Sequence, residues 1–306
     1  MKEIINYYYN FDIVDVIQNK NYTSFIYNGE DFYFVFFNRS EEELKDIINI
    51  ITELKYKSFF AHDIIVNRNG SVLTKVGDNY YVLLKVIGNK NQIISFDDVV
   101  NNFWKLKLNN KNSRLYRNNW GELWSKKIDY FEYQMNEIGK DKKIIIDSFS
   151  YYVGLSENAI SYVNKINSVI KIDDSDKIVL SHRRIFYPNT YLNYYNPLSF
   201  IFDLEVRDVA EMIKSEFFYG EDAFFLVSYY LKNIKLSSYS YHMFYARLMY
   251  PTYYFDLYEE IMNNNKSEEC LLKIIDKIDD YELFLKKVHL EISKYTRLEK
   301  IDWLLK

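Results

Sequence analysis

Residues suited to charge and proton chemistry gather between positions 182 and 208. Asn189 and Asp203 supply hard oxygen ligands of the kind that magnesium takes, so they could form half of a metal site. The alternative is structural, with Asn189 bracing its own loop and Asp203 pairing with Arg184. His182 either acts catalytically or holds its loop through a backbone hydrogen bond. Asp208 is favoured at a helix start by capping and by the helix dipole, so it is expected to be architectural.

The elements before this region predict a small lobe. Asn28-Gly29 is a two-residue hairpin signal between strands expected at Thr23–Tyr27 and Phe32–Phe37. A helix is expected next, since Ser40 and Glu43 fit a capping box and apolar residues recur at helical spacing. Three strand-like runs follow: Asp63–Asn67, Ser71–Val76 and Tyr80–Ile87. The order is ββαβββ, and the lobe boundary is expected near residue 90.

Almost all of the chain after residue 90 has helical periodicity. An apolar stripe predicts a long helix that ends at Gly139; its members are Trp124, Ile128, Phe131, Met135 and Ile138. The remaining expected elements are a helix from about Ser156, a strand over Lys177–Leu180, and helices over Asp208–Phe217, Ala223–Leu231, Tyr241–Tyr250 and from Glu268 onward. We therefore expect an α+β fold with a small five-stranded antiparallel sheet plus one helix in residues 1–90 and a larger, mostly helical lobe in residues 91–306.

This layout, with a strand leading into a His-containing loop, resembles the protein-kinase-like fold. Its details resemble the aminoglycoside and choline phosphotransferase branch, in which the catalytic loop has the form H-G-D-x-x-x-x-N. Here His182-Arg183-Arg184-Ile185-Phe186-Tyr187-Pro188-Asn189 keeps the spacing of His to Asn. Phe200-Ile201-Phe202-Asp203 resembles the strand that ends in the metal-binding aspartate. By this resemblance, Asp208 braces the catalytic loop.

Within that superfamily the chain is most similar to the YutH- and CotS-type spore coat proteins. Three stretches carry the resemblance: Trp120–Asp129, Asp203–Glu211 and Tyr245–Pro251. The resemblance implies a single kinase-like domain that acts in spore coat assembly by binding other coat proteins. It also implies the spore coat as the destination, whereas the N-terminus, which lacks the order of a signal peptide, predicts synthesis and residence in the cytoplasm.

Several parts of a phosphotransferase are missing or altered. Arg184 stands at the catalytic aspartate position, and a guanidinium cannot accept a proton at neutral pH. The strand Phe32–Phe37 has no phosphate-binding lysine, and Asn28-Gly29 offers one glycine where a phosphate cradle uses several. Lys75 or Lys85 could replace the lysine, with Glu43 or Glu53 as partner; the alternative is that both are solvent-facing or ion-paired. Glu205 is a further candidate, as a displaced base.

These observations favour a catalytically inactive pseudokinase that needs no cofactor. The rival function is an active small-molecule phosphotransferase that uses Mg-ATP through Asn189, Asp203 and an unrecognised lysine. A third is a pseudokinase that binds an anionic metabolite through its arginines. Basic residues that could line such a site are Arg183, Arg184, Arg207, Lys126 and Lys127, although surface ion pairs also explain them.

The composition excludes several other classes. A net charge of -4 over 306 residues gives no global attraction to nucleic acid or to anionic membranes. The single cysteine, Cys270, allows no intramolecular disulfide and suits a reducing compartment. The N-terminus lacks the order of a signal peptide, and no apolar run predicts insertion into a membrane. Four dispersed histidines show no metal-ligand spacing, and the 31 tyrosines reflect either AT-biased coding or a Tyr-rich binding face.

Overall fold

The chain forms two compact units in a computed structural model. The structure describes residues 1–20, 22–101, 106, 108, 112–139, 141–172, 175–185, 187–220, 222–264 and 266–305. The first unit comprises Met1–Ile94, Lys107–Tyr116 and Pro188–Ile201, and the second comprises Ser95–Leu106, Arg117–Tyr187 and Phe202–Lys306. The sequence predicts a single boundary near residue 90. The first unit does end one segment close to that position, at Ile94, but it also contains two later segments of the chain.

The first unit is built on a 6-stranded antiparallel sheet with the order β1-β2-β3-β6-β4, in which β5 also pairs with β6. The strands are β1 (Ile17–Gln18), β2 (Tyr22–Tyr27), β3 (Glu30–Phe37), β4 (Asp63–Ile65), β5 (Thr74–Val76) and β6 (Asn79–Lys85). The five predicted strands are present, with β4 and β5 shorter than expected. The additional strand, β1, has only two residues, too few for a periodic signal.

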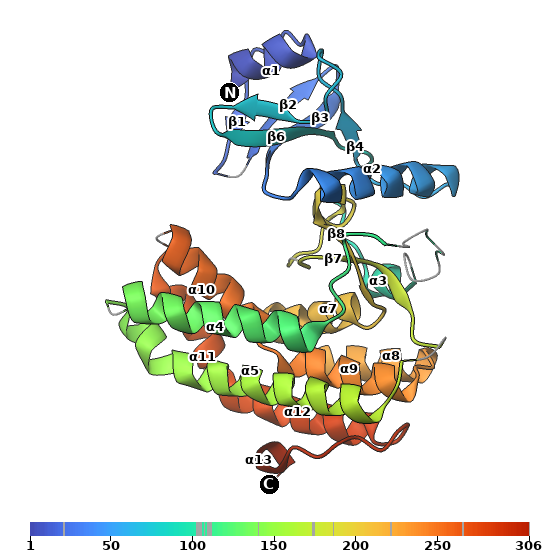
Figure 1. Cartoon of the computed structure of the whole chain (residues 1–306), viewed down its shortest axis with the longest axis vertical. Coiled ribbons are helices and arrows are strands. Elements are labelled where there is room, and N and C mark those ends of the chain that lie inside the picture. Colours follow the sequence, from blue (N-terminus) through green and yellow to red (C-terminus); the bar gives the residue numbers. More distant parts are fainter. Residues whose placement is uncertain are drawn as a thin grey trace. The chain divides into compact units, whose positions relative to one another are not determined.

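The two faces of this sheet are covered by different helices (Figure 1). Phe32 and Phe34 on β3 pack in a cluster with Ile5 of α1 (Lys2–Tyr9), a helix that the sequence pattern does not predict. Tyr33 and Phe37 point to the opposite face and pack with Leu44 of α2 (Glu41–Tyr56). Successive side chains on a strand alternate between faces, so the aromatic run of β3 supplies both cores.

Local signals place the hairpin and α2 as predicted. Asn28 and Gly29 have φ values of 51° and 78°, which a two-residue turn between β2 and β3 requires and which these residue types tolerate. Ser40 caps α2, since its Oγ accepts a hydrogen bond from the Glu43 N–H at 3.2 Å. The short helices α6 (Tyr191–Tyr194) and Pro197–Ser199 complete the first unit.

The second unit is mostly helical. Helix α5 (Lys143–Val169) packs between α4 (Trp120–Ile138) and α9 (Ser238–Met249), and α12 (Ile278–Ile292) also packs on α9 (Figure 1). The strands β7 (Ile178–His182) and β8 (Phe200–Leu204) form a 2-stranded sheet beside α7 (Arg207–Tyr219). The other helices are α3 (Phe96–Asn101), α8 (Ala223–Asn233), α10 (Thr252–Asn264), Glu268–Leu271, α11 (Leu272–Ile275) and α13 (Asp302–Leu305).

Three helix predictions need correction. Helix α5 begins at Lys143, not near Ser156, and α10 was not predicted. The region after Glu268 is divided into several short and long helices instead of one. The stripe on α4 is buried at Trp124, Ile128 and Phe131, but Ile138 is 57% exposed, so the core contact ends before the helix does.

Candidate functional site

His182 and Asp208 form the frame of the region that the sequence singled out. His182 ends β7 and is 1% exposed. The Asp208 carboxylate, in the first turn of α7, accepts a hydrogen bond from the His182 backbone N–H at 3.1 Å and lies 2.6 Å from its ring Nδ1. One acidic side chain thus fixes both the backbone and the ring of His182, which is the bracing expected of Asp208.

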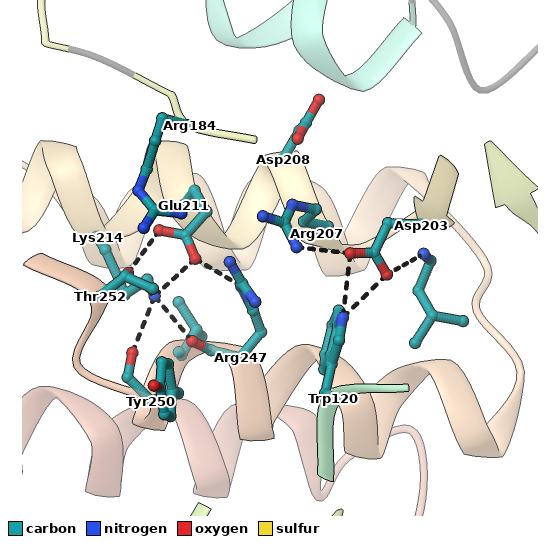
Figure 2. A network of polar contacts seen from close by, with 12 residues as sticks. Trp120, Arg184, Asp203, Arg207, Asp208, Glu211, Lys214, Arg247, Tyr250 and Thr252 are labelled. Carbon is teal, nitrogen blue, oxygen red and sulfur yellow. Dashed lines mark hydrogen bonds and ion pairs between the residues drawn. The ribbon is translucent and has the colours of Figure 1, made fainter. Parts of the chain in front are cut away.

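Asp203 is held in a closed set of contacts at the end of β8 (Figure 2). Its carboxylate accepts hydrogen bonds from Trp120 Nε1 at 2.9 and 3.1 Å, from the Leu204 N–H at 2.8 Å and from Arg207 Nη1 at 2.5 Å. Asp203 is 0% exposed; burial raises its pKa, and the charge of Arg207 is the main opposing influence. Three N–H donors, one of them shared by the two oxygens, thus contact both oxygens of the carboxylate, and Arg207 supplies its positive partner. This arrangement of Asp203 does not fit a magnesium ligand.

Arg207 connects Asp203 to the loop after β7. Beyond its ion pair with Asp203, it donates from Nε to the His182 carbonyl at 2.9 Å and from Nη2 to the Arg183 carbonyl at 3.1 Å. The guanidinium is almost completely buried. It therefore serves as a tie between β8, α7 and the chain that follows His182.

Arg184 does not pair with Asp203, contrary to the prediction. Its Nε donates to Asp256 Oδ1 at 2.7 Å, and its Nη1 donates to the Arg183 carbonyl at 2.8 Å. Asp256 lies on α10, a helix that the sequence pattern does not predict, so the sequence gives no sign of this partner. The residue at the catalytic aspartate position is thus a half-buried cation with an acidic partner.

A second buried charge network lies along α7 (Figure 2). Glu211 accepts hydrogen bonds from Arg247 Nε at 2.5 Å, Lys214 Nζ at 2.9 Å and Thr252 Oγ1 at 2.7 Å. Lys214 is 1% exposed and also donates to Thr252 Oγ1 and to the carbonyls of Arg247 and Tyr250. Only the ammonium form has three protons to donate, so this geometry holds Lys214 charged, although burial lowers its pKa.

Aromatic rings join the two networks. The rings of Trp120 and Trp124 stack at 5.3 Å, and Trp124 stacks on Tyr250 at 4.2 Å. The Arg247 guanidinium carbon lies 5.2 Å from the Trp120 ring centre and 5.6 Å from that of Trp124, within the range of cation–π attraction. Trp120 therefore donates its indole N–H to Asp203, while the face of its ring lies toward the Arg247 guanidinium.

The candidate phosphate-binding residues lie in the first unit. Lys75 is exposed on β5, and Lys85 Nζ lies 2.7 Å from Glu30. Glu43 on α2 forms an ion pair with Arg39, with 3.2 Å between Glu43 Oε2 and Arg39 Nε. The nearly buried Arg39 side chain also donates hydrogen bonds to the carbonyls of Leu198 and Phe200. Glu53 lies 3.5 Å from Lys57. The third strand, β3, has no lysine.

Asn189 also belongs to the first unit, whereas Asp203 belongs to the second. Asn189 is 5% exposed, and its carbonyl accepts a hydrogen bond from the Ile94 N–H at 2.8 Å. Among the described residues its amide Nδ2 has no hydrogen-bond partner. The backbone contact connects the chain after Pro188 to the end of the first segment of that unit.

The remaining candidates are ion-paired. Glu205 is buried 3.8 Å from Lys177, and burial raises its pKa to about 7 while Lys177 opposes the shift. Lys126 pairs with Glu122 at 2.5 Å, and Lys127 pairs with Glu259.

Cys270 is a half-buried free thiol. In the described ranges, no group of three or more His, Cys, Asp or Glu side chains is arranged to hold a metal ion.

His62 connects the Pro188–Ile201 segment to the sheet of the first unit, and its burial should make the stability of the fold depend on pH. It is fully buried, its Nδ1 accepts from the Ile87 N–H at 3.2 Å, and its Nε2 lies 3.2 Å from the Leu192 carbonyl. Burial lowers its pKa to about 4. The unfolded chain binds this proton near pH 6.5, so stability should fall as the pH drops from about 6.5 to about 4, by about 3 kcal/mol from this group.

The measurement is circular dichroism of thermal unfolding across this pH range, for the wild type and for His62→Gln. The comparison is needed because the raised pKa of Glu205 gives a contribution of opposite sign, which is lost as the pH rises from about 4.5 to about 7. The wild type should lose more stability on acidification than the variant. Equal losses in the two proteins would show that His62 is not a buried neutral histidine.

Comparison with known proteins places the chain in a family. Residues 2–288 match the profile of the family described as "Spore coat putative kinase YutH". The chain belongs to this family. The endospore coat-associated protein YutH of Bacillus subtilis (strain 168) is 31% identical to it over 187 residues, a match that spans about half of each protein, 54% in both cases. The resemblance to YutH-type proteins drawn from the sequence is thus confirmed.

Solved structures show which fold this YutH-family chain has. An aminoglycoside phosphotransferase from Alicyclobacillus acidocaldarius superposes with a TM-score of 0.63 at 9% identity and covers 94% of this chain and 95% of its own. AMP-bound spectinomycin phosphotransferase gives 0.59 at 14% identity, with 91% and 94% covered. Amicoumacin kinase hAmiN, in complex with AMP-PNP and Ca²⁺, gives 0.54 at 10% identity, with 99% and 95% covered. The predicted kinase-like α+β fold, with an antiparallel sheet and a larger helical part, is confirmed.

Proposed function

We propose that this chain is a catalytically inactive, kinase-fold protein that acts in the spore coat by binding other coat proteins. The coat assignment is supported by family membership and by the coat-associated name of the Bacillus subtilis relative. Among the described helices, none has the length and hydropathy needed to cross a bilayer. We infer cytoplasmic synthesis followed by assembly into the coat.

The observation that carries the proposed inactivity is the state of Asp203. An aspartate that binds catalytic magnesium must present its oxygens to the ion. Here both oxygens accept hydrogen bonds from Trp120, Arg207 and Leu204, and the carboxylate is fully buried. Arg184 adds a positive charge where the reaction needs a proton acceptor. The contacts of Asp203 support a structural role in place of metal binding.

The rival proposal is an active, Mg-ATP-dependent phosphotransferase. The fold favours it, because the solved relatives include an AMP-bound and an AMP-PNP-bound enzyme. It requires Asp203 to exchange Arg207 and Trp120 for a metal ion. It also requires a phosphate-binding lysine, whereas Lys85 is paired with Glu30 and β3 carries none.

Thermal unfolding with and without Mg-ATP separates the two proposals. A ligand present at about one hundred times its dissociation constant stabilises the folded state by about 2.7 kcal/mol. For the inactive protein, we expect the midpoint at millimolar Mg-ATP to equal the midpoint with Mg²⁺ alone. A nucleotide-dependent rise that is lost in Asn189→Ala would instead demonstrate a Mg-ATP site and favour the phosphotransferase. Asp129→Asn, an exposed site on α4, serves as the matched control.

A further inference from the structure

A groove lies at the outer edge of the sheet in the first unit. It has a volume of about 470 Å³ and lies between the chain before β1 and the end of β2. Residues 12–17 form one side, residues 24–28 form the other, and Asp31 and Lys90 complete the lining. All of these residues belong to the first unit.

The groove exists because β1 stops pairing with β2 early. The ladder consists of Ile17 opposite Ser24 and Gln18 opposite Thr23, and it does not continue to Asp15 opposite Ile26. In an antiparallel pair, residues that exchange hydrogen bonds alternate with residues that do not. The two-residue turn makes Tyr27 and Glu30 an exchanging pair, so the N–H and C=O of Ile26 point away from β3 and toward the groove. This position is an open strand edge.

The side chains around the edge are apolar and acidic. Val14, Ile17 and Ile26 line the groove and are 75%, 69% and 66% exposed, so three exposed β-branched side chains lie around one site. Asp12 and Asp15 are exposed and form no ion pair with any described residue. The third acid, Asp31, is neutralised by Lys90 at 2.6 Å. The groove therefore offers apolar contacts together with two uncompensated negative charges.

We propose that this groove binds an extended segment of a partner protein in which apolar and basic residues alternate. Such a segment would add a short strand beside Ile26, as in recognition by strand addition. Its apolar side chains would cover Val14, Ile17 and Ile26, and its basic side chains would meet Asp12 and Asp15. The inference rests on the proposed function, since it names the class of partner that a coat-assembly protein recognises through this edge.

The test measures binding of a fluorescent synthetic peptide in which valine and lysine alternate, by anisotropy, to the full chain. A peptide in which valine and glutamate alternate is the charge control. We expect the valine–lysine peptide to bind at least about tenfold more tightly than the valine–glutamate peptide, and to lose affinity as salt is added. Equal binding of the two peptides, or no binding of the valine–lysine peptide, would overturn the proposal.

Variants separate charge from backbone pairing. Asp12→Asn with Asp15→Asn should weaken the valine–lysine peptide about tenfold and keep the fold, because both sites are exposed. Ile26→Pro removes the outward N–H without removing a ladder bond and should also weaken binding. The paired control, Asp129→Asn with Glu132→Gln on α4, should bind as the wild type does. Unchanged affinity in the Asp12/Asp15 variant would contradict binding of the peptide in the groove. The Mg-ATP experiment is independent of this result, because it tests catalytic inactivity and involves no residue of the groove.

Discussion

Replacement of Asp203 by alanine should lower the free energy of unfolding of the second unit by about 3–5 kcal/mol. The substitution leaves the buried Arg207 guanidinium without its carboxylate and the Trp120 N–H without its acceptor. Removing one partner of a buried ion pair leaves an uncompensated charge, which costs more than the pair itself contributes. Asp203→Asn should cost less, because an amide oxygen can still accept from Trp120 and Leu204.

Urea unfolding followed by tryptophan fluorescence measures this effect. Trp120, Trp124 and Trp303, the tryptophans among the residues that the structure describes, lie in the second unit, so their fluorescence reports on that unit. Asp129→Ala on exposed α4 is the control and should stay within about 0.5 kcal/mol of the wild type. Residues held in place for function are often neutral or even unfavourable for stability. An Asp203→Ala protein as stable as the wild type would therefore argue for a metal ligand.

Replacement of Glu211 by alanine should be about as damaging, again by about 3–5 kcal/mol. Glu211 is the carboxylate partner of both Lys214 and Arg247, and both cations are almost completely buried. Attraction to these cations holds the pKa of Glu211 well below its usual range, against the opposing effect of burial. Without Glu211, two like charges remain in a site that excludes water.

A double-mutant cycle tests the network more sharply. Lys214→Met removes one of the two cations, so it should cost less in the Glu211→Ala background than in the wild type. The coupling energy should lie between about 0.5 and 3 kcal/mol. Strictly additive effects of Glu211→Ala and Lys214→Met would mean that these side chains do not act as one network.

Features with a local sequence signal were predictable. The hairpin turn at Asn28-Gly29 needs a left-handed backbone conformation at both positions. Asn and Gly adopt that conformation most readily, so the dipeptide predicts the turn. Helix α4 shows its apolar stripe and its Gly139 end. The first half of α5 lacks such a signal, because its apolar residues are not spaced as one stripe and Gly154 interrupts it. Helix α1 is short and packs on the sheet through residues such as Ile5, and strand β1 has two residues that pair with β2; neither gives a long periodic pattern in the sequence.

The partners of the site residues were less predictable than the residues themselves. Asp203 and Arg207 are four positions apart, and this local spacing could have indicated their ion pair. Trp120 is 83 residues from Asp203, and Asp256 is 72 residues from Arg184. The only available hint for Trp120 was that a buried indole N–H requires an acceptor. Contacts across such separations depend on how helices pack, so the sequence suggested Asp203 as the partner of Arg184 in place of Asp256.

The loop motif thus keeps its frame while its polar groups have structural partners. Asp208 still holds the backbone and the ring of His182. The oxygens of Asp203, however, accept hydrogen bonds from Arg207 and Trp120, and Arg184 donates to Asp256. These contacts are compatible with the proposed role of the chain as a catalytically inactive binding protein.

Manganese binding tests the central claim most directly, because Mn²⁺ replaces Mg²⁺ at oxygen sites and its free form has a strong electron paramagnetic resonance signal. The signal should be measured with a non-hydrolysable ATP analogue, with and without the full chain. The structural role of Asp203 predicts that the protein leaves the spectrum of Mn²⁺ and nucleotide unchanged. A saturable change in that spectrum, lost in both Asp203→Asn and Asn189→Ala, would contradict it.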